Sequence, residues 1–271
     1  MMKPREEAML TRRALLAGAT AWPLSAAATS FPWPRGKRGA LSFTFDDARA
    51  SQIDVGLPFF SGIGLRATFY VSPASYRRRI DGWRSVVGYG HEIGHHSLTH
   101  PCSVNYRFSR ENALEDYTLE KMSADLDAAT LDIQETFGVT PVSFAYPCGQ
   151  SYVGRGTQRK SYVPLIAQKF LSGRGFMNES ANDPARCDLA YLMGMSSDGL
   201  NAISMLSLVE AAMTENNWLI LAGHEVGKAG PQSTDTDALR EVWRYAQNPA
   251  NGIWTGTVAE ISGYMAKQRG A

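Results

Sequence analysis

The sequence has almost no net charge, no long apolar run and no internal repeat. Its 27 basic and 26 acidic side chains leave a net charge of +1, which gives no electrostatic reason to expect nucleic acid or an anionic membrane surface as a partner. No apolar run reaches the roughly 18 residues that a helix needs to cross a bilayer, so we expect no membrane span. There is also no low-complexity tract after the N-terminus.

Cysteine is also scarce. Cys102, Cys148 and Cys187 are the three cysteines of the chain, so at most one disulfide can form and one thiol is left over. The sequence does not choose the pair. The plainest interpretation is that these residues are structural.

The first residues are typical of an export signal. Arg12 and Arg13 precede a weakly apolar stretch at 14–24 and small residues at 26–28, which resembles a twin-arginine signal peptide. A disordered basic tail is the alternative. We expect residues 1–28 to be the signal, 29–38 a linker and 39–271 one folded domain that is periplasmic or secreted, where a disulfide is permitted.

The rest of the chain alternates predicted strands with predicted helices. The predicted strands are 40–45, 65–71, 92–93, 141–146, 218–222 and 252–254, with weak candidates at 175–176 and 189–193. The main predicted helices are 109–137, capped by Ser109, then 202–215, 236–247 and 258–267. This alternation predicts an α/β fold with a mostly parallel sheet in a single domain.

Polar residues follow several of these strands. Asp46 and Asp47 come at the end of the first strand, a histidine segment at 90–101 follows the third, and Cys148 and His224 follow two later ones. In a parallel barrel the carboxyl ends of the strands share one rim, where active sites form. Four distant segments are therefore expected to meet on one face.

The histidine segment holds four of the five histidines of the chain. Two pairs are spaced four apart, His91 with His95 and His96 with His100, and either spacing suits two imidazoles on one divalent metal. Pro101 disfavours helical geometry at His100, so the segment is expected to form a turn.

Asp47 with His96 and His100 would make a site of two histidines and one carboxylate, which leaves a position open for water or substrate. Asp46 could accept a proton from the water, and His224 could protonate the leaving group. Backbone N–H groups in the turn at 147–149 could bind an oxyanion. These parts predict metal-assisted hydrolysis of an amide or ester.

Each feature also has a simpler interpretation. Two aspartates at a strand end are often a solvated turn or a helix cap, and a histidine after an apolar strand is usually a packing residue. The spacing of four alone does not establish a metal site. Their joint placement after strands is what favours function.

At these residues the chain resembles the polysaccharide deacetylases, carbohydrate esterase family four. The matching segments are 44–47 with the family's TFDD, 67–70 with ATFF, 90–101 with GHEIGNHTxxHP, 147–149 with the end of RxPYG, and 219–224 with a late LxxH element. The resemblance spans about 39–267 and implies a distorted (β/α)7 barrel that acts as a hydrolase.

The resemblance also implies residue roles. Asp46 corresponds to the base and His224 to the acid, while Asp47, His96 and His100 correspond to the metal ligands. The backbone N–H of Cys148 would donate to the oxyanion. His95 takes a position usually held by Asn, and His91 matches a structural position, so neither is expected to bind metal.

The chain departs from the family pattern at three places. Ala145 takes the position of an arginine that contacts the base, which removes a cation expected to keep Asp46 ionised. Cys148 replaces an aromatic residue, and Tyr146 is expected to reshape the substrate pocket. The family's Asp–Trp segment has no clear match, although Asp198 lies in about the right region. Trp254 is a candidate to line the sugar site, with core packing as the alternative.

The sequence thus predicts a metal-dependent deacetylase that acts on N- or O-acetyl groups of a carbohydrate, with zinc the expected divalent ion. Two alternatives stay open. One is a hydrolase of a small non-sugar amide on the same scaffold, and the other is a carbohydrate-binding accessory protein without turnover. The sequence gives no indication of the glycan, the linkage or the oligomeric state.

Overall fold

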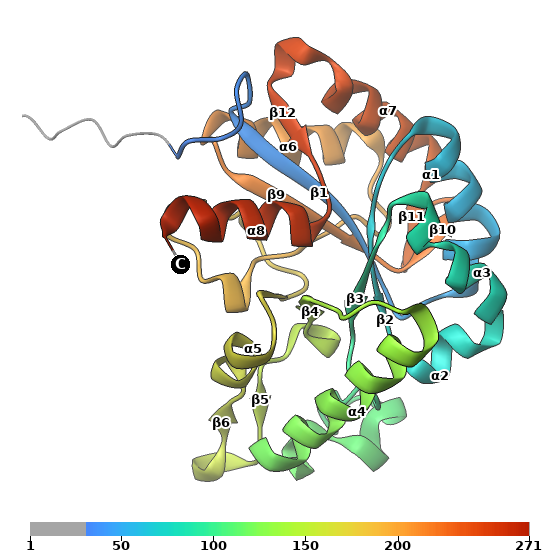
Figure 1. Ribbon diagram of the computed structural model, residues 1–271, viewed down its shortest axis with the longest axis vertical. Coiled ribbons are helices and arrows are strands. Elements are labelled where there is room, and N and C mark those ends of the chain that lie inside the picture. Colours follow the sequence, from blue (N-terminus) through green and yellow to red (C-terminus); the bar gives the residue numbers. More distant parts are fainter. Residues whose placement is uncertain (1–30, 271) are drawn as a thin grey trace, which may run out of the picture. The chain divides into compact units, whose positions relative to one another are not determined.

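The structure is a computed structural model that describes residues 31–270 (Figure 1). The predicted export signal at 1–28 lies outside the described residues. Within 31–270, no helix combines the length and the apolar character that a bilayer crossing would need.

Short strands alternate with helices, as the sequence predicts, and Figure 1 shows the helices packed around the outside of the sheet. The strands are β1 (Gly39–Asp46), β2 (Thr68–Val71), β3 (Glu92–His95), β4 (Ser143–Ala145), β5 (Tyr152–Val153), β6 (Lys160–Ser161), β7 (Ser172–Arg174), β8 (Met195–Ser196), β9 (Trp218–Gly223), β10 (Glu225–Gly227), β11 (Ser233–Asp235) and β12 (Ile253–Thr255). The α-helices are α1 (Leu57–Ile63), α2 (Pro73–Tyr76), α3 (Ile80–Ser85), α4 (Leu119–Phe137), α5 (Val163–Lys169), α6 (Ala202–Thr214), α7 (Thr236–Gln247) and α8 (Val258–Arg269).

The main sheet is parallel and curls toward closure. Its order is β7-β4-β3-β2-β1-β9-β8, with β12 paired to the first residues of β1. Leu192 forms a parallel bridge to Arg174 of β7, and β8, three residues further on, pairs with β9. The segment 192–196 therefore links the two edges of the sheet. The predicted distorted (β/α)7 barrel is confirmed in a single domain.

The central strand is β1, and all eight of its residues are buried. Such burial on both faces is typical of a parallel strand that is covered by helices outside and side chains inside. Strand β9 pairs with it along Ala40–Phe45, while β2 pairs with it at Thr44–Asp46. The pairing brings the ends of these strands, and the polar residues after them, to one rim.

The long predicted helix at 109–137 begins later than expected. Helix α4 starts at Leu119, and Thr118 caps it by accepting a hydrogen bond from the Lys121 N–H at 3.2 Å. The hydroxyl of Ser109 instead bonds the backbone N–H and carbonyl of Cys102, at 2.7 and 3.0 Å. Because the predicted cap bonds another loop, residues 107–116 form short 3₁₀ turns.

The prediction that Trp254 lines a sugar site is wrong. Trp254 is in register with Ala40 near the start of β1, six residues before Asp46 and thus about 20 Å away along the strand. It packs edge-on against Tyr264 and Trp33, and Trp33 is itself 8% exposed. Trp254 is therefore core packing at the opposite end, and part of the predicted linker at 29–38 is packed on the domain.

Candidate active site

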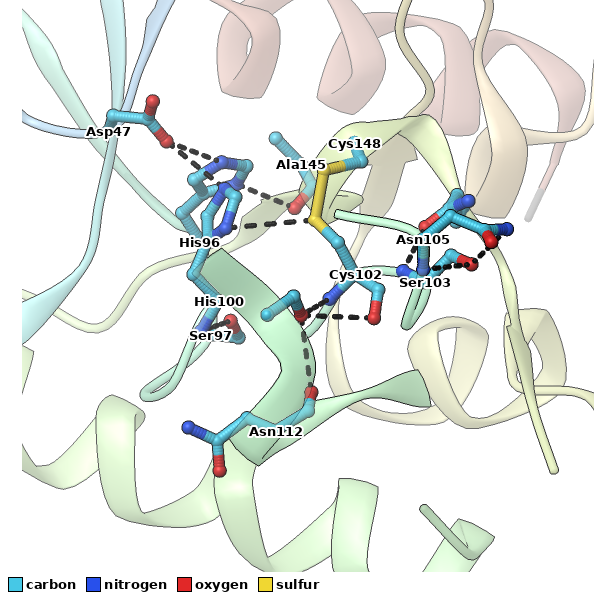
Figure 2. The surroundings of a disulfide bond; sticks show 12 residues. Asp47, His96, Ser97, His100, Cys102, Ser103, Asn105, Asn112, Ala145 and Cys148 are labelled. Carbon is cyan, nitrogen blue, oxygen red and sulfur yellow. Dashed lines mark hydrogen bonds and ion pairs between the residues drawn. A yellow bond between two sulfur atoms is a disulfide. The ribbon is translucent and has the colours of Figure 1, made fainter. Parts of the chain in front are cut away.

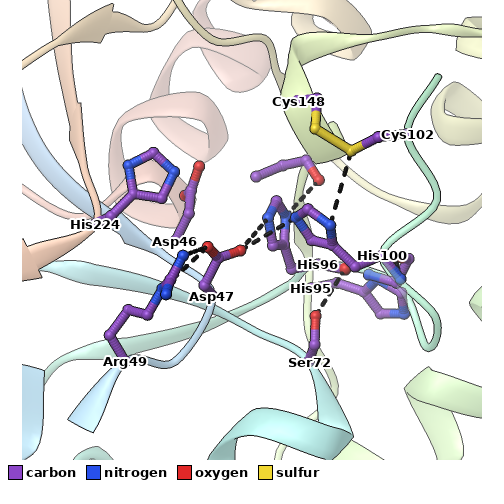
Figure 3. A network of polar contacts seen from close by, with 12 residues as sticks. Asp46, Asp47, Arg49, Ser72, His95, His96, His100, Cys102, Cys148 and His224 are labelled. Carbon is purple, nitrogen blue, oxygen red and sulfur yellow. Dashed lines mark hydrogen bonds and ion pairs between the residues drawn. A yellow bond between two sulfur atoms is a disulfide. The ribbon is translucent and has the colours of Figure 1, made fainter. Parts of the chain in front are cut away.

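Asp47, His96 and His100 come together at the carboxyl ends of β1 and β3. The Oδ1 atom of Asp47 lies 3.3 Å from Nε2 of His96 and 3.1 Å from Nε2 of His100 (Figure 3). One ligand atom from each residue lies within 4.8 Å of the others, which is close enough to share one ion. Of the two histidine pairs that the spacing allows, the structure selects the second.

The orientation of the His96 ring is fixed by a neighbouring strand. Its Nδ1 lies 2.9 Å from the carbonyl oxygen of Ala145 on β4, so Nδ1–H donates there and Nε2 is turned toward Asp47. Histidines that bind metals characteristically have such a partner on the other ring nitrogen. The Nδ1 atom of His100 faces the Cys102 sulfur at 3.7 Å.

The second carboxylate oxygen of Asp47 has a partner that the sequence analysis missed. Nη2 of Arg49 donates to Oδ2 of Asp47 at 2.9 Å, which orients the carboxylate with Oδ1 toward the imidazoles. Burial alone would raise the pKa of Asp47. The hydrogen bonds and charges of His100 and His96 outweigh it, so that the pKa lies well below its usual value.

The carboxylate of Asp46 pairs with Arg174, which reaches it from the end of β7. Both groups are almost fully buried, and the Arg174 guanidinium also lies 4.9 Å from the ring centre of Tyr70. The expected loss of the cation next to Asp46 is therefore wrong. Ala145, which takes the family's arginine position, is in register with Arg174, and the cation comes from the adjacent strand.

His224 follows β9 and has a carboxylate partner. Its Nδ1 lies 2.6 Å from Oδ2 of Asp198, and its backbone N–H donates to Oδ1 of the same residue at 3.1 Å. Burial alone would lower the pKa of His224, but the hydrogen bond to Asp198 and the charges of Asp46, Asp198 and Asp47 raise it above its ordinary value. Asp198 thus provides the aspartate of the family's Asp–Trp segment, for which the sequence showed no clear match.

Gln52 ties together the two strand ends that carry Asp46 and His224. Its buried Nε2 donates to the backbone carbonyls of Asp46 at 2.6 Å and of His224 at 2.7 Å. Figure 3 shows His224 beside Asp46 on one side of Asp47, with His96 and His100 on the other. The predicted base, acid and ligand residues therefore share one rim.

A disulfide between Cys102 and Cys148 joins the turn at 147–149 to the residue that directly follows the histidine segment (Figure 2). The sequence left this pairing open. Cys148 has φ of 54°, and a Cβ on Gly149 would come within 2.9 Å of the Phe176 backbone. The turn is thus held close to the site in a conformation that few side chains adopt.

Tyr146 is not a substrate residue. Its side chain is fully buried, and its hydroxyl donates to the carbonyl of Ala190 at 2.7 Å. The ring packs against Phe144, Tyr162 and Tyr191. The prediction that Tyr146 reshapes the pocket is wrong because its ring and hydroxyl are both used in the core.

The two other histidines of the segment are structural, as the resemblance implies. Nδ1 of His91 accepts the Ala67 N–H at 3.0 Å, and burial lowers the pKa of His91 to about 4. Nδ1 of His95 accepts the Ser97 N–H at 3.0 Å, and burial lowers the pKa of His95 to about 3. Both imidazoles are therefore neutral near pH 7 and engaged by the backbone.

Unusual backbone conformations gather at this rim. Among residues 31–270, seven residues other than glycine have positive φ, and five of them lie in the site segments: Asp47, Ala48, Ser97, His100 and Cys148. Such conformations cost free energy and persist where the surrounding structure holds them, commonly at functional sites. They identify the same rim independently of the side chains.

Residues 34–160 match the family described as polysaccharide deacetylase. This stretch includes Asp46, Asp47, His96, His100 and the turn at 147–149. The resemblance to this family that the sequence showed is therefore confirmed over residues 34–160.

Solved structures support the fold. A putative polysaccharide deacetylase from Mycobacterium smegmatis has 19% sequence identity and a TM-score of 0.62, over 90% of this chain and 96% of that one. A family 4 acetyl xylan esterase from Clostridium thermocellum, in complex with a cobalt ion, has 17% identity and a TM-score of 0.55, over 83% and 91% of the two chains. At these identities the likeness concerns the fold alone.

Two curated relatives are longer than this chain, and the chain matches less than a third of each. A gellan lyase from a Bacillus species is 23% identical over 260 residues, which is 87% of this chain and 10% of the relative. The uncharacterized protein YlxY of Bacillus subtilis is 28% identical over 113 residues, which is 42% of this chain and 30% of the relative. The matches thus span small parts of both relatives.

Proposed function

We propose that this protein is a metal-dependent hydrolase that removes N- or O-acetyl groups from a carbohydrate. The observation that carries the proposal is that Oδ1 of Asp47 lies within 3.3 Å of Nε2 on both His96 and His100. The match of residues 34–160 to the polysaccharide deacetylases supports the same reaction class.

Asp47, His96 and His100 would hold the cation. Their donors fit a divalent ion, because the bond from Nδ1–H of His96 to Ala145 turns Nε2 toward Asp47, and Arg49 binds only one of the two carboxylate oxygens of Asp47. Two nitrogens and one oxygen suit zinc, which is the metal we propose. A divalent cation at such a site acidifies a water molecule and polarises the acetyl carbonyl.

Asp46 acts as the general base in this proposal. Its carboxylate lies beside Asp47 (Figure 3), and the ion pair with Arg174 orients it. His224 acts as the general acid and gives its proton to the departing amine or alcohol. Asp198 accepts from Nδ1–H of His224, which leaves Nε2–H to face the substrate.

The backbone N–H of Cys148 donates to the developing oxyanion. The disulfide to Cys102 ties this donor to the segment that carries His100, two residues before Cys102. A donor held in advance stabilises charge in the transition state without reorganising as the reaction proceeds. We further propose that the protein works outside the cytoplasm, in agreement with the twin-arginine pattern at its N-terminus.

Acetate release from acetylated oligosaccharides tests the proposal. We expect Asp46→Asn to lose at least about a hundredfold in kcat while it keeps its metal, since the base acts only on the proton. Asp54→Asn is the matched control, because Asp54 is exposed and pairs only loosely with Arg79. Turnover by Asp46→Asn at the wild-type rate would refute the assigned base.

The alternative of a small non-sugar amide as substrate rested on a missing arginine and a missing Asp–Trp segment. Arg174 now supplies the cation and Asp198 the carboxylate, so only the tryptophan is without a counterpart in the segment 193–199. Linear and cyclic amides, assayed in parallel with acetylated sugars, separate the two substrate classes.

A further inference from the structure

Two aromatic side chains stand exposed beside His100. Phe108 is 68% exposed and lies in the short 3₁₀ segment at Arg107–Asn112. Tyr106, which directly precedes this segment, is 44% exposed. Their ring centres are 5.4 Å apart, and the Phe108 ring lies 6.1 Å from the His100 ring. A single exposed aromatic is ordinary, but an exposed pair of which one ring, Phe108, lies against a candidate metal ligand is not.

The loop that carries this aromatic pair is anchored at both ends. Glu115 accepts from the Ser103 hydroxyl at 2.6 Å and from the Val104 N–H at 2.8 Å. Ser109 bonds the backbone of Cys102, which is itself tied to the turn at 147–149 by the disulfide. The two rings are therefore presented by a fixed loop, and binding to them costs little ordering entropy.

We propose that Tyr106 and Phe108 form a binding subsite for a pyranose ring next to the acetylated sugar. This inference rests on the proposed function and specifies its substrate as an oligosaccharide or polysaccharide chain. The C–H face of a pyranose is apolar and flat enough to cover an aromatic ring, while its rim of hydroxyls stays in water. A sugar on the Phe108 ring would border His100, so the next sugar along the chain would lie over the site.

The subsite predicts a dependence on chain length that a single-sugar pocket would not show. We expect kcat/KM of the wild type to rise as acetylated substrates are extended from one sugar to four. Phe108→Ala and Tyr106→Ala should each lower kcat/KM on the tetrasaccharide roughly tenfold, mainly through KM, because a neighbouring sugar is bound equally in the ground and transition states.

The test uses N-acetylchito-oligosaccharides and acetylated xylo-oligosaccharides of one to four sugars, with 4-nitrophenyl acetate as a substrate that has no sugar. Each variant should keep its activity on 4-nitrophenyl acetate and on single sugars within about twofold of the wild type. Phe108→Tyr, which keeps an aromatic face, should retain most of the rise in kcat/KM with the number of sugars in the substrate. The control is Tyr89→Ala, because Tyr89 is 56% exposed but precedes β3, at the opposite end of the sheet.

The outcomes separate the subsite from the proposed function. Oligosaccharide kcat/KM within twofold of the wild type in both alanine variants would overturn the subsite and leave deacetylation intact. If no substrate releases acetate, the proposed function fails, and calorimetric binding of the tetrasaccharides then tests the subsite. Binding that Phe108→Ala weakens about tenfold supports it, and an absence of binding, or binding to lipid vesicles in its place, overturns it.

Discussion

Ala145 and Arg174 are in-register neighbours on β4 and β7, and Arg174 makes the ion pair with Asp46 that the residue at position 145 makes in the family pattern. Side chains of paired residues in a parallel sheet point to the same face. The cation that pairs with Asp46 therefore comes from β7, the strand next to β4.

This relationship predicts what happens when Arg174 is removed and when an arginine is placed at position 145 instead. Arg174→Gln leaves the buried carboxylate of Asp46 without its partner, so the free energy of unfolding should fall by about 3–5 kcal/mol. Deacetylation should fall with it, because Asp46 is no longer oriented. The double variant Ala145→Arg with Arg174→Ala should recover a large part of both losses.

Urea denaturation and acetate release measure both effects. The matched control is Arg79→Gln, since Arg79 pairs with Asp54 on the surface and such pairs contribute about 0–1 kcal/mol. An Arg174→Gln variant as stable and as active as the wild type would show that the buried pair has no such role.

The raised pKa of His224 predicts the alkaline limit of activity. A general acid must be protonated, so activity should fall as the pH rises through the pKa of His224, which lies above the ordinary value of 6.5. Asp198→Asn removes a charge and a hydrogen-bond acceptor that raise this pKa. The alkaline limb of the profile of kcat/KM against pH should then move to lower pH.

The pH profile of Asp54→Asn provides the control, because that carboxylate is not among the groups that shift the pKa of His224. An alkaline limb that stays in place in Asp198→Asn would mean that another group sets it. A fall in kcat without any shift would assign Asp198 to orienting the imidazole alone.

The sequence allowed most of the fold and the centre of the site to be predicted. Strand β1 and its two terminal aspartates stand out because a buried strand needs apolar residues and a strand end tolerates charge. Helix α7 was predicted with the observed bounds, because Asp235 caps it and its apolar positions keep helical spacing.

Arg174 could not be predicted in the same way. Strand β7 has three residues, Ser-Gly-Arg, with neither an apolar run nor a β-branched side chain to mark it. The pair with Asp46 also joins residues 128 apart, and its existence depends on a register that local patterns do not encode. The predictions that Trp254 and Tyr146 line the substrate site were wrong for a related reason. Whether a side chain lies at the active-site end of the sheet or in the core depends on how the strands pair, which the sequence does not show.

The disulfide predicts a link between stability and the metal site. Cys102→Ala with Cys148→Ala opens a loop of 46 residues, which should lower the free energy of unfolding by about 4 kcal/mol. Metal affinity should fall as well, because His100 is two residues from Cys102 and its Nδ1 faces that sulfur. Cys187→Ala, at the cysteine outside the disulfide, is the control.

Urea denaturation and zinc titration would measure these changes. A double variant that keeps both its stability and its zinc affinity would show that the disulfide does not hold the histidine segment. Loss of stability with unchanged affinity would mean that the segment is held by its other contacts. Among these are the hydrogen bonds that Asp125 accepts from the Leu98 N–H at 2.8 Å and from the Thr99 hydroxyl at 2.6 Å.

Metal content tests the central claim most directly, since every role proposed for this rim depends on one cation shared by Asp47, His96 and His100. Elemental analysis after dialysis against zinc should give one equivalent per chain in the wild type. The His96→Ala, His100→Ala double variant, folded by circular dichroism, should hold almost none, while His91→Gln should match the wild type. A double variant that retains one equivalent, or a wild type that binds none, would contradict the account.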